Sequence, residues 1–254
     1  MLLKKMHKSI ETSTDNNTTQ QNEDILYQAY VVYPKEWGSV FSKCANMGVF
    51  HLIQKITNEK GKFYPEPVDL FKAFHCTPLN KVKVVIVGQD PYPGLTASGT
   101  PKATGLSFSQ RDTESISPSN RNIFKELVRT HSDVGFVHPK NGNLQRWASQ
   151  GVLLLNRCLT FFPNIKMTRN EKKFWNPFIK VVIDAIISAN RNVVFVMWGN
   201  DAQELSLFIN SNIKTLEWSR PSPLCRRPFV GNNHFVEIDE HLKLHNMVPI
   251  DWAL

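Results

Sequence analysis

Cysteine is scarce in this 254-residue chain, and its four copies are widely separated (Cys44, Cys76, Cys158, Cys225). No two of them form a C-x-x-C pair, so a zinc ribbon, an iron–sulfur cluster and a redox dithiol all lack their usual ligand spacing. The default state of such thiols is reduced. We therefore expect neither disulfides nor a metal site.

Long apolar runs are also absent. No stretch approaches the roughly 20 apolar residues that a membrane-spanning helix needs. The basic first residues are not followed by the apolar segment of a secretory signal. We expect a protein that is neither inserted in a membrane nor secreted. Its expected location is inside the cell, in the nucleus or the cytoplasm, and the sequence is compatible with a cellular or a viral source.

Basic residues outnumber acidic ones, which gives a formal net charge of +8, while 41% of the residues are apolar. That apolar share is typical of a globular protein with a sizeable core. The positive charge favours a polyanionic partner, although many basic proteins bind no nucleic acid. Charge alone therefore leaves the partner open.

The first residues differ in composition from the rest. Residues 9–24 are polar, with one isoleucine and no aromatic side chain, and cannot bury enough apolar surface to offset the entropy lost on ordering. Aromatic and aliphatic residues recur regularly from Ile25 onward, with no second linker and no internal repeat. We predict a disordered arm over residues 1–24 and one domain over residues 25–254.

Four segments are interpreted as buried strands: residues 82–87, 152–155, 193–198 and 213–218, of which the first is largely β-branched. Apolar residues at helical spacing lie between them, over residues 120–130, 174–189 and 201–210. Strands that alternate with helices form right-handed βαβ units. The predicted fold class is α/β: a three-layer α/β/α sandwich with a short, mostly parallel four-stranded central sheet.

The first of these strands ends abruptly in a polar cluster. Gly88 permits a close backbone approach, and Pro91 cannot continue the ladder of hydrogen bonds. Gln89, Asp90 and Tyr92 therefore lie in a loop at the carboxyl end of the strand, where open α/β sheets bind their ligands. A polar turn that only closes the strand is the plainer interpretation of an Asp-Pro pair. The joint presence of amide, carboxylate and phenol favours a ligand site.

Further short motifs follow the later strands in a fixed order. They are Gly105-Leu106-Ser107-Phe108-Ser109, Leu153-Leu154-Leu155-Asn156, Gly199-Asn200, Pro221-Ser222-Pro223-Leu224, Gly231-Asn232-Asn233-His234-Phe235 and Ile250-Asp251-Trp252. Together with the cluster at residues 88–92, this series resembles the uracil-DNA glycosylases of family 1, from about residue 64 to residue 252. Several ordered motifs over most of a domain are far more specific than one short motif.

The resemblance implies that a deoxyuridine is rotated out of DNA into a pocket, where its N-glycosidic bond is hydrolysed to free uracil and an abasic site. Phe108 would stack on the base, and Asn156 would read both O4 and N3–H, because one amide donates and accepts. Tyr92 would exclude the C5 methyl group of thymine, and Gln89 belongs to the same uracil-binding set. Singly, three of these residues have plainer explanations. Phe108 could be a core aromatic, Asn156 a strand-end cap and Tyr92 a packed aromatic side chain.

The same resemblance implies the catalytic role of Asp90. The carboxylate would orient and activate water against the anomeric carbon and stabilise an oxocarbenium-like sugar, much as in glycoside hydrolysis. Uracil would leave as a resonance-stabilised anion. The implied enzyme is a monofunctional, metal-independent hydrolase of base-excision repair that needs no cofactor.

The implied DNA contacts come from hydroxyl groups and backbone amides, which bind phosphates without reading sequence. These residues are Ser117, Ser119, Gly199, Asn200 and Ser222. Ser119 is also a candidate N-cap for the helix predicted from residue 120. Leu224, on a loop stiffened by two prolines, would fill the space that the base leaves in the stack. A rigid turn is the plainer alternative for that loop.

Several positions depart from the family. Pro93 stands where histidine is common, Asn200 stands where serine is usual, and the loop over residues 95–104 is longer. Most serious, Arg220 stands where the family has the neutral histidine that donates a hydrogen bond to uracil O2. Losing one such preorganised donor typically costs about 3–4 kcal/mol. His234 is no obvious replacement, because the family has its own histidine there.

Arg220 leaves two alternatives open. Its always-charged guanidinium could stabilise the uracil anion directly, or it could turn toward a phosphate or Asp90 and leave O2 without a donor. We expect retained but reduced or retuned activity. The expected partners are single- and double-stranded DNA containing uracil, with a monomeric state and a proteinaceous inhibitor or a replication partner as further candidates.

Two hypotheses of other classes remain beside the glycosylase. A glycosylase-fold module could bind DNA or a replication partner with weak or no catalysis, because of Arg220. A glycosylase for another base is disfavoured by Tyr92 and Asn156.

Overall fold

The computed structural model describes residues 27, 29, 31–112 and 114–254, so the predicted N-terminal arm lies outside the described residues. The sheet consists of β1 (Val84–Gly88), β2 (Val152–Asn156), β3 (Val194–Trp198) and β4 (Thr215–Trp218). Its spatial order is β2-β1-β3-β4, and all three pairings are parallel. The predicted strands and fold class are confirmed, although three of the strands begin one or two residues later than expected.

Helices precede and connect these strands. They are α3 (Gly38–Asn46), α4 (Val49–Lys60), α5 (Lys72–Cys76), α6 (Pro118–His131), α7 (Gln145–Ser149), α8 (Asn176–Ala189), α9 (Asn200–Gln203) and α10 (His234–Leu244). Short 3₁₀ turns are η1 (Lys35–Trp37), η2 (Pro67–Asp69), η3 (Leu79–Lys81), η4 (Glu171–Trp175) and η5 (Glu204–Phe208). In the described part of the chain, none is long and apolar enough to cross a membrane.

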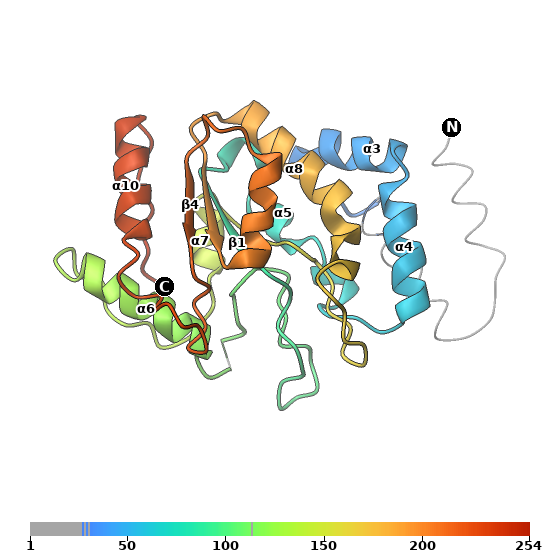
Figure 1. The fold of residues 1–254 in the computed structure, drawn as a ribbon, viewed down its shortest axis with the longest axis horizontal. Helices are drawn as coiled ribbons and strands as arrows, with labels where there is room; N and C mark the ends of the chain where they lie inside the picture. The colour runs from blue at the N-terminus through green and yellow to red at the C-terminus, as the bar shows by residue number, and fades with distance from the viewer. Residues whose placement is uncertain (1–26, 28, 30, 113) are drawn as a thin grey trace.

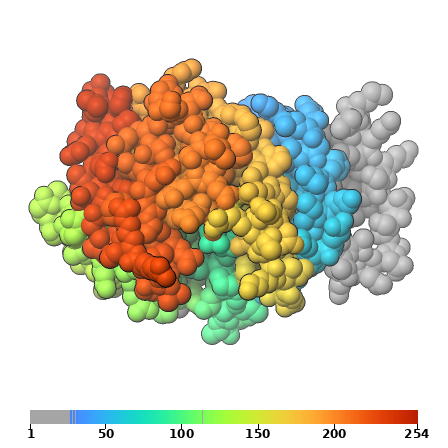
Figure 2. All heavy atoms as spheres, in the orientation of Figure 1, coloured from blue at the N-terminus to red at the C-terminus, as the bar shows by residue number. Residues whose placement is uncertain are grey.

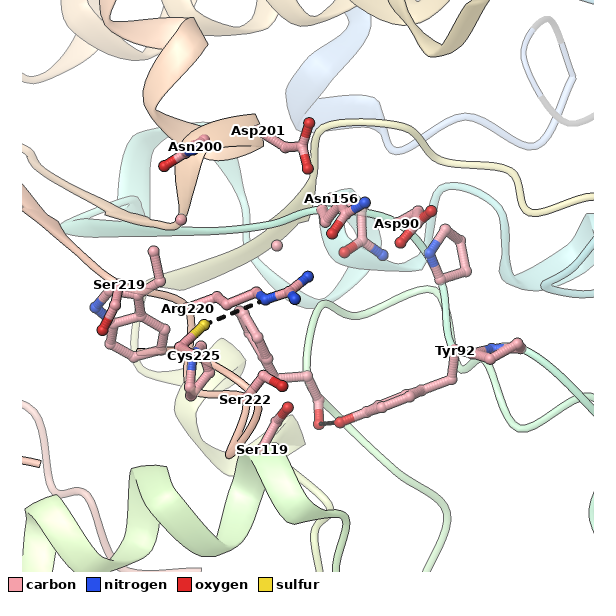
Figure 3. A pocket seen from close by; sticks show the side chains of 18 of the residues that line it. Asp90, Tyr92, Ser119, Asn156, Asn200, Asp201, Ser219, Arg220, Ser222 and Cys225 are labelled. Atoms are coloured by element: carbon pink, nitrogen blue, oxygen red, sulfur yellow. Dashed lines mark hydrogen bonds between the residues drawn. The ribbon is translucent and has the colours of Figure 1, made fainter. Parts of the chain in front are cut away.

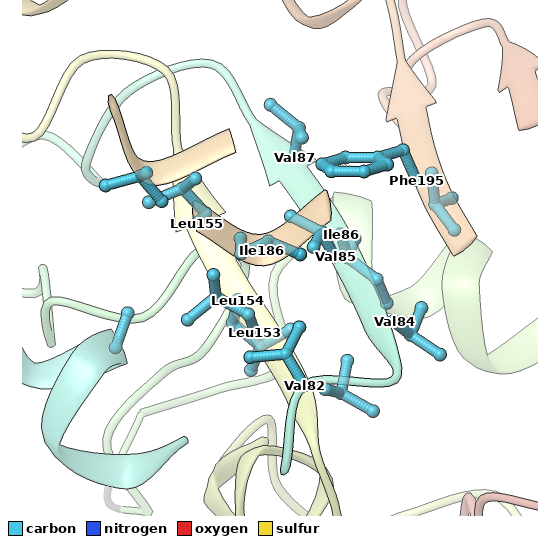
Figure 4. Packing of buried hydrophobic residues seen from close by; sticks show 14 of the residues in the cluster. Val82, Val84, Val85, Ile86, Val87, Leu153, Leu154, Leu155, Ile186 and Phe195 are labelled. Atoms are coloured by element: carbon cyan, nitrogen blue, oxygen red, sulfur yellow. The ribbon is translucent and has the colours of Figure 1, made fainter. Parts of the chain in front are cut away.

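The helices cover both faces of the sheet, with α6 and α10 on one side and α3, α4 and α8 on the other (Figure 1). On the α8 side, aromatic rings pack edge to face, as Phe41 does against Phe178 with ring centroids 5.8 Å apart. On the α10 side, Trp147 packs against Trp252 at 5.1 Å and donates its indole N–H to the Trp252 carbonyl at 2.9 Å. Between them, the strands contribute a continuous apolar layer (Figure 4). The two layers of core hold the sheet rigidly from both faces.

Two local predictions are wrong. The helix expected over residues 201–210 is one turn of α9 followed by the 3₁₀ turn η5. Here the Ser206 hydroxyl donates to the Gln203 carbonyl at 2.7 Å, a local bond that competes with regular helix. The N-cap of α6 is Ser117, whose Oγ accepts from the Asn120 N–H at 3.1 Å, whereas Ser119 lies inside the first turn.

Glu126 on α6 holds the chain that enters α10. Its buried carboxylate accepts hydrogen bonds from the backbone N–H groups of Gly231 at 2.6 Å and Asn233 at 2.8 Å, and from Arg129 at 2.7 Å. Burial raises the pKa of this carboxyl, but the bonds from Arg129, Gly231 and Asn233 together outweigh burial and hold the pKa below its ordinary value. The ionised form is therefore the one that stabilises this connection.

Replacing Glu126 by Gln should lower the free energy of unfolding at neutral pH by about 1–3 kcal/mol, because an amide accepts weaker hydrogen bonds and presents a donor to backbone donors. With a lowered folded-state pKa, the contribution of Glu126 is complete above its unfolded-state pKa and is lost as the pH falls through the folded-state pKa. Urea unfolding at a series of pH values should show the difference between the two proteins narrowing in acid.

The control is Glu240→Gln, which removes the same charge from an exposed position of α10. Its effect should stay below about 0.5 kcal/mol. A Glu126→Gln difference that is constant down to acid pH would contradict the assignment.

Candidate active site

A cavity of about 940 Å³ opens at the carboxyl ends of the strands. Figure 2 shows the segments that surround it reaching the lower edge of the molecule: the chain after β1 in teal, the chain before α8 in yellow and the loop after β4 in dark orange. The lining includes most of the predicted site residues: Gln89, Asp90, Tyr92, Phe108, Ser119, Asn156, Gly199, Asn200, Arg220 and Ser222 (Figure 3). Residues from six separate segments therefore face one space.

Two predicted residues lie outside this lining. Leu224 is 85% exposed on the loop after β4, where an apolar side chain of this size has no contact to protect it from water. That loop is anchored to α6, because the Asn122 amide donates to the Pro221 carbonyl at 3.0 Å. Ser117 lies behind the wall and shares a hydrogen bond of 2.9 Å with the Tyr92 hydroxyl.

Phe108 has a strained backbone that its neighbours hold in place. Its φ of 60° lies in the left-handed region, which a bulky residue seldom adopts. The Phe108 carbonyl accepts from the Asn120 amide at 2.9 Å and from the Tyr92 hydroxyl at 3.2 Å. Its ring packs edge-on against Trp198 with centroids 5.5 Å apart. Strain that is maintained by several contacts is typical of a binding site.

Tyr92 forms a second fixed wall. Burial raises the pKa of Tyr92 to about 12, while the hydrogen bond with Ser117 works weakly in the opposite direction. The phenol therefore stays neutral and keeps its proton for hydrogen bonding near neutral pH. Its ring is held at the hydroxyl end and cannot turn away from the cavity.

Asn156 reaches the cavity from the end of β2, directly beside Gly88 of β1. A Cβ atom at Gly88 would lie 2.4 Å from Asn156 Oδ1 and 2.8 Å from Ser107 Cβ. Ser107 is itself fixed, since its hydroxyl donates to the Ile86 carbonyl at 3.1 Å and its N–H to the Leu154 carbonyl at 3.0 Å. No described residue forms a hydrogen bond with the side-chain amide of Asn156. Its N–H donor and its carbonyl acceptor therefore face the cavity that Asn156 lines.

Asp90 has a partner that the sequence did not indicate. The ammonium of Lys172, just before α8, donates to Asp90 Oδ2. Arg220 has another partner: its Nε donates to Cys225 Sγ at 3.3 Å, and its guanidinium points into the cavity toward Asn156 (Figure 3). Among the described residues, Asp90 and Arg220 form no ion pair, so that alternative for Arg220 is not observed.

His234 lies apart from the cavity lining, at 3% exposure. Its Nδ1 accepts the indole N–H of Trp198 at 3.1 Å, and burial lowers its pKa to about 4, against smaller opposing effects of Glu237 and Glu126. The ring is therefore neutral and occupied near pH 7. The expectation that His234 does not replace the missing histidine agrees with this position.

The loop over residues 95–104, which the sequence predicts to be longer than in the family, forms a small hairpin. Leu95 bridges Pro101, and the Thr96 N–H donates to the Thr100 carbonyl at 2.8 Å. Ser98 adds a hydroxyl contact of 2.8 Å to Thr96. The hairpin projects from the molecule (Figure 1), and Ala103 and Thr104 at its end line the cavity. That its shape differs from that of the family's loop stays a prediction.

The sequence analysis missed several residues at the cavity. Arg169, Cys225, Arg226 and Arg227 line it, and Lys172 contacts its carboxylate. A signal was present, because basic residues cluster between positions 166 and 173 and again at 226 and 227. Their contacts follow from tertiary structure, which brings these segments to the end of β1.

The chain is similar in sequence to known proteins. A model of the uracil DNA glycosylase superfamily matches residues 74–243. A uracil-DNA glycosylase of Phocaeicola vulgatus is 41% identical over 191 residues, covering 74% of this chain and 83% of the relative. One from Deinococcus radiodurans is 37% identical over 225 residues, covering 87% and 88%.

Solved structures of viral origin are similar as well. The crystal structure of mimivirus uracil-DNA glycosylase superposes with a TM-score of 0.80 at 26% identity and covers 96% of this chain and 95% of that one. A variant of the mimivirus protein, solved in complex with UGI, has a TM-score of 0.76 at 29% identity and covers 87% and 89%.

The contact between Gly88 and Asn156 yields a test of the site's construction. Gly88→Ala should lower the free energy of unfolding by about 1–3 kcal/mol, because the new methyl group has no room and Asn156 must turn aside. Gly38→Ala is the matched control, since its Cβ would make an ordinary 3.5 Å contact with Tyr33. Urea unfolding measures both, and equal stability of the two variants would contradict the close approach.

Proposed function

The chain belongs to the uracil-DNA glycosylase superfamily, and we propose that Asp90, Arg220, Asn156, Phe108 and Tyr92 carry out its reaction. It is a glycosylase that removes uracil from DNA. The observation that carries the residue assignment is that all five line one cavity at the carboxyl ends of parallel strands. The binding-module alternative is not favoured.

The pocket selects the base by shape and hydrogen bonding. The Asn156 amide, unpartnered among the described residues, donates to O4 and accepts from N3–H of uracil, whereas cytosine presents the opposite pattern. The wrong base would leave buried groups unpaired, which is a costly mismatch. Tyr92, fixed through its hydroxyl, occupies the space of a thymine methyl group, and Phe108 stacks on the ring, with Gln89 beside them.

Asp90 activates the water. As the C1′–N1 bond breaks, its electron pair leaves with uracil and positive charge develops on the sugar. The Asp90 carboxylate stabilises that charge, and the water oxygen bonds to C1′ while its proton passes to the carboxylate. The reaction needs no bound metal in this scheme, and the enzyme leaves the DNA backbone intact.

Arg220 supplies the donor on the base side. With Nε engaged by Cys225, its terminal N–H groups remain for uracil O2, where the negative charge of the leaving base accumulates. Its direction into the cavity supports this role over a turn toward a phosphate.

The rim of the cavity binds DNA. Ser119, Ser222 and the Gly199-Asn200 turn offer hydroxyl, amide and backbone donors to phosphates, and Ser117 supports them from the cap of α6. Leu224, 85% exposed on an anchored loop, fills the gap left by the flipped nucleotide. We expect activity on single- and double-stranded DNA by a monomer inside the cell. An inhibitor partner is supported by the mimivirus structure solved in complex with UGI.

Asp90→Asn tests the reaction. Uracil release, measured as alkali-labile sites in uracil-containing DNA under single turnover, should fall by about 10²-fold or more, because a neutral amide neither stabilises the sugar cation nor accepts the proton. DNA affinity should change little. Absence of release by the native protein at high concentration, with the variant no different, would falsify the function.

Arg220 has a separate test. Arg220→Ala should lower single-turnover uracil release by about 10²- to 10³-fold through loss of one preorganised donor. Arg220→His should also fall below the native rate, because the shorter ring has lost the Cys225 contact that directs the arginine. If the histidine variant is instead much faster than the native protein, Arg220 impairs catalysis.

A further inference from the structure

The segment between β2 and α8 approaches the catalytic carboxylate, although no motif in it indicated a function. The turn that leads into η4 is closed by two reciprocal hydrogen bonds. The Thr168 N–H donates to Glu171 Oε2 at 2.7 Å, and the Glu171 N–H donates to Thr168 Oγ1 at 3.3 Å. Its end is fixed by Trp175, which is fully buried and donates to Thr160 Oγ1 at 3.0 Å. Lys172 therefore projects from a turn that is held at both ends.

Lys172 reaches Asp90 from outside the cavity. Asp90 lines the cavity, whereas Lys172 is not among its lining residues. The two side chains are 17% and 20% exposed, so the pair is largely shielded from water. Lys172 engages Oδ2, and no described residue donates a hydrogen bond to Oδ1. One oxygen is thus held from behind while the other is left for the cavity.

Among the residues that the structure describes, no neighbouring group donates a hydrogen bond to the Asp90 carboxylate in place of Lys172. Pro91 and Pro93 have no N–H group, so the loop offers Asp90 fewer donors than other residues would. Two neighbouring cations of the segment have their own acidic partners: Arg169 pairs with Asp201 at 2.7 Å, and Lys173 approaches Glu204 at 3.6 Å. Lys172 is therefore directed selectively to the carboxylate.

We propose that Lys172 is a positioning residue for Asp90: it fixes one carboxylate oxygen so that the other faces the attacking water. The inference rests on the proposed function and adds a residue to its machinery. The ammonium also places positive charge near a developing sugar cation, which by itself would slow the reaction. Orientation outweighs that effect here, because a misplacement of about 1 Å can cost up to about 10²-fold in rate.

The test uses Lys172→Met under single turnover with uracil-containing DNA. The maximal rate should fall about 10- to 100-fold, while the DNA concentration for half-maximal rate changes less than about threefold, since Lys172 lies behind the cavity. Lys172→Arg, which keeps a charged donor, should recover most of the rate. If the methionine variant is unstable, Lys172→Gln replaces it, and the same fall in maximal rate is expected.

Two comparisons separate positioning from a general effect. Lys173→Met removes the same charge from the next, more exposed residue and should match the native rate. In an Asp90→Asn background, Lys172→Met should have no further effect, because the group that it positions is gone. Additive losses, or a native or faster rate for Lys172→Met, would overturn the inference. Failure of the proposed function is distinct, because the native protein itself would then release no uracil.

Discussion

The in-register parallel pairing of β1 with β2 is the constraint on which the cavity depends. Gly88 stands directly opposite Asn156, and the ladder continues past both strands, with the Arg157 N–H donating to the Gly88 carbonyl at 2.9 Å and the Cys158 N–H to the Gln89 carbonyl at 3.1 Å. A slip of one residue would turn every side chain to the opposite face. Asn156 and the loop that carries Asp90 are thus placed by main-chain hydrogen bonds inside a rigid core.

A second layer of support surrounds Phe108. Its left-handed backbone is unfavourable by itself, yet its carbonyl accepts from both Tyr92 and Asn120. Ser117 connects the same network to the start of α6, since it both caps that helix and contacts the Tyr92 hydroxyl. Phe108 and Tyr92, which line the cavity, therefore belong to one hydrogen-bonded unit. Such a unit reduces reorganisation when the base enters.

Much of this architecture could be predicted because it depends on local pattern. β-branched runs identify buried strands, and parallel strands bring their carboxyl ends to one edge, which was enough to group Asp90, Asn156 and Arg220. Other features depend on tertiary contacts. Ser117 rather than Ser119 caps α6, and Lys172 meets Asp90 across 82 positions of sequence, so no spacing rule indicates either. Structure was also needed to show that Arg220 contacts Cys225 and forms no ion pair with Asp90.

The positions of Lys172 and Arg220 can be explained by the order of charges along the proposed reaction. Lys172 pairs with Asp90, and both Asp90 and Arg220 line the cavity. In the proposed reaction, Asp90 would face the sugar, which becomes positive, and Arg220 would face the departing uracil, which becomes negative. Neighbouring charges alternate in sign along this series. In that reaction, the positive charge of Arg220 would add attraction to the leaving base. In the structure, Arg220 Nε donates to Cys225 Sγ at 3.3 Å, which leaves the terminal N–H groups of the guanidinium for the base. The position of each charge, rather than the net positive charge of the site, decides whether it assists the reaction.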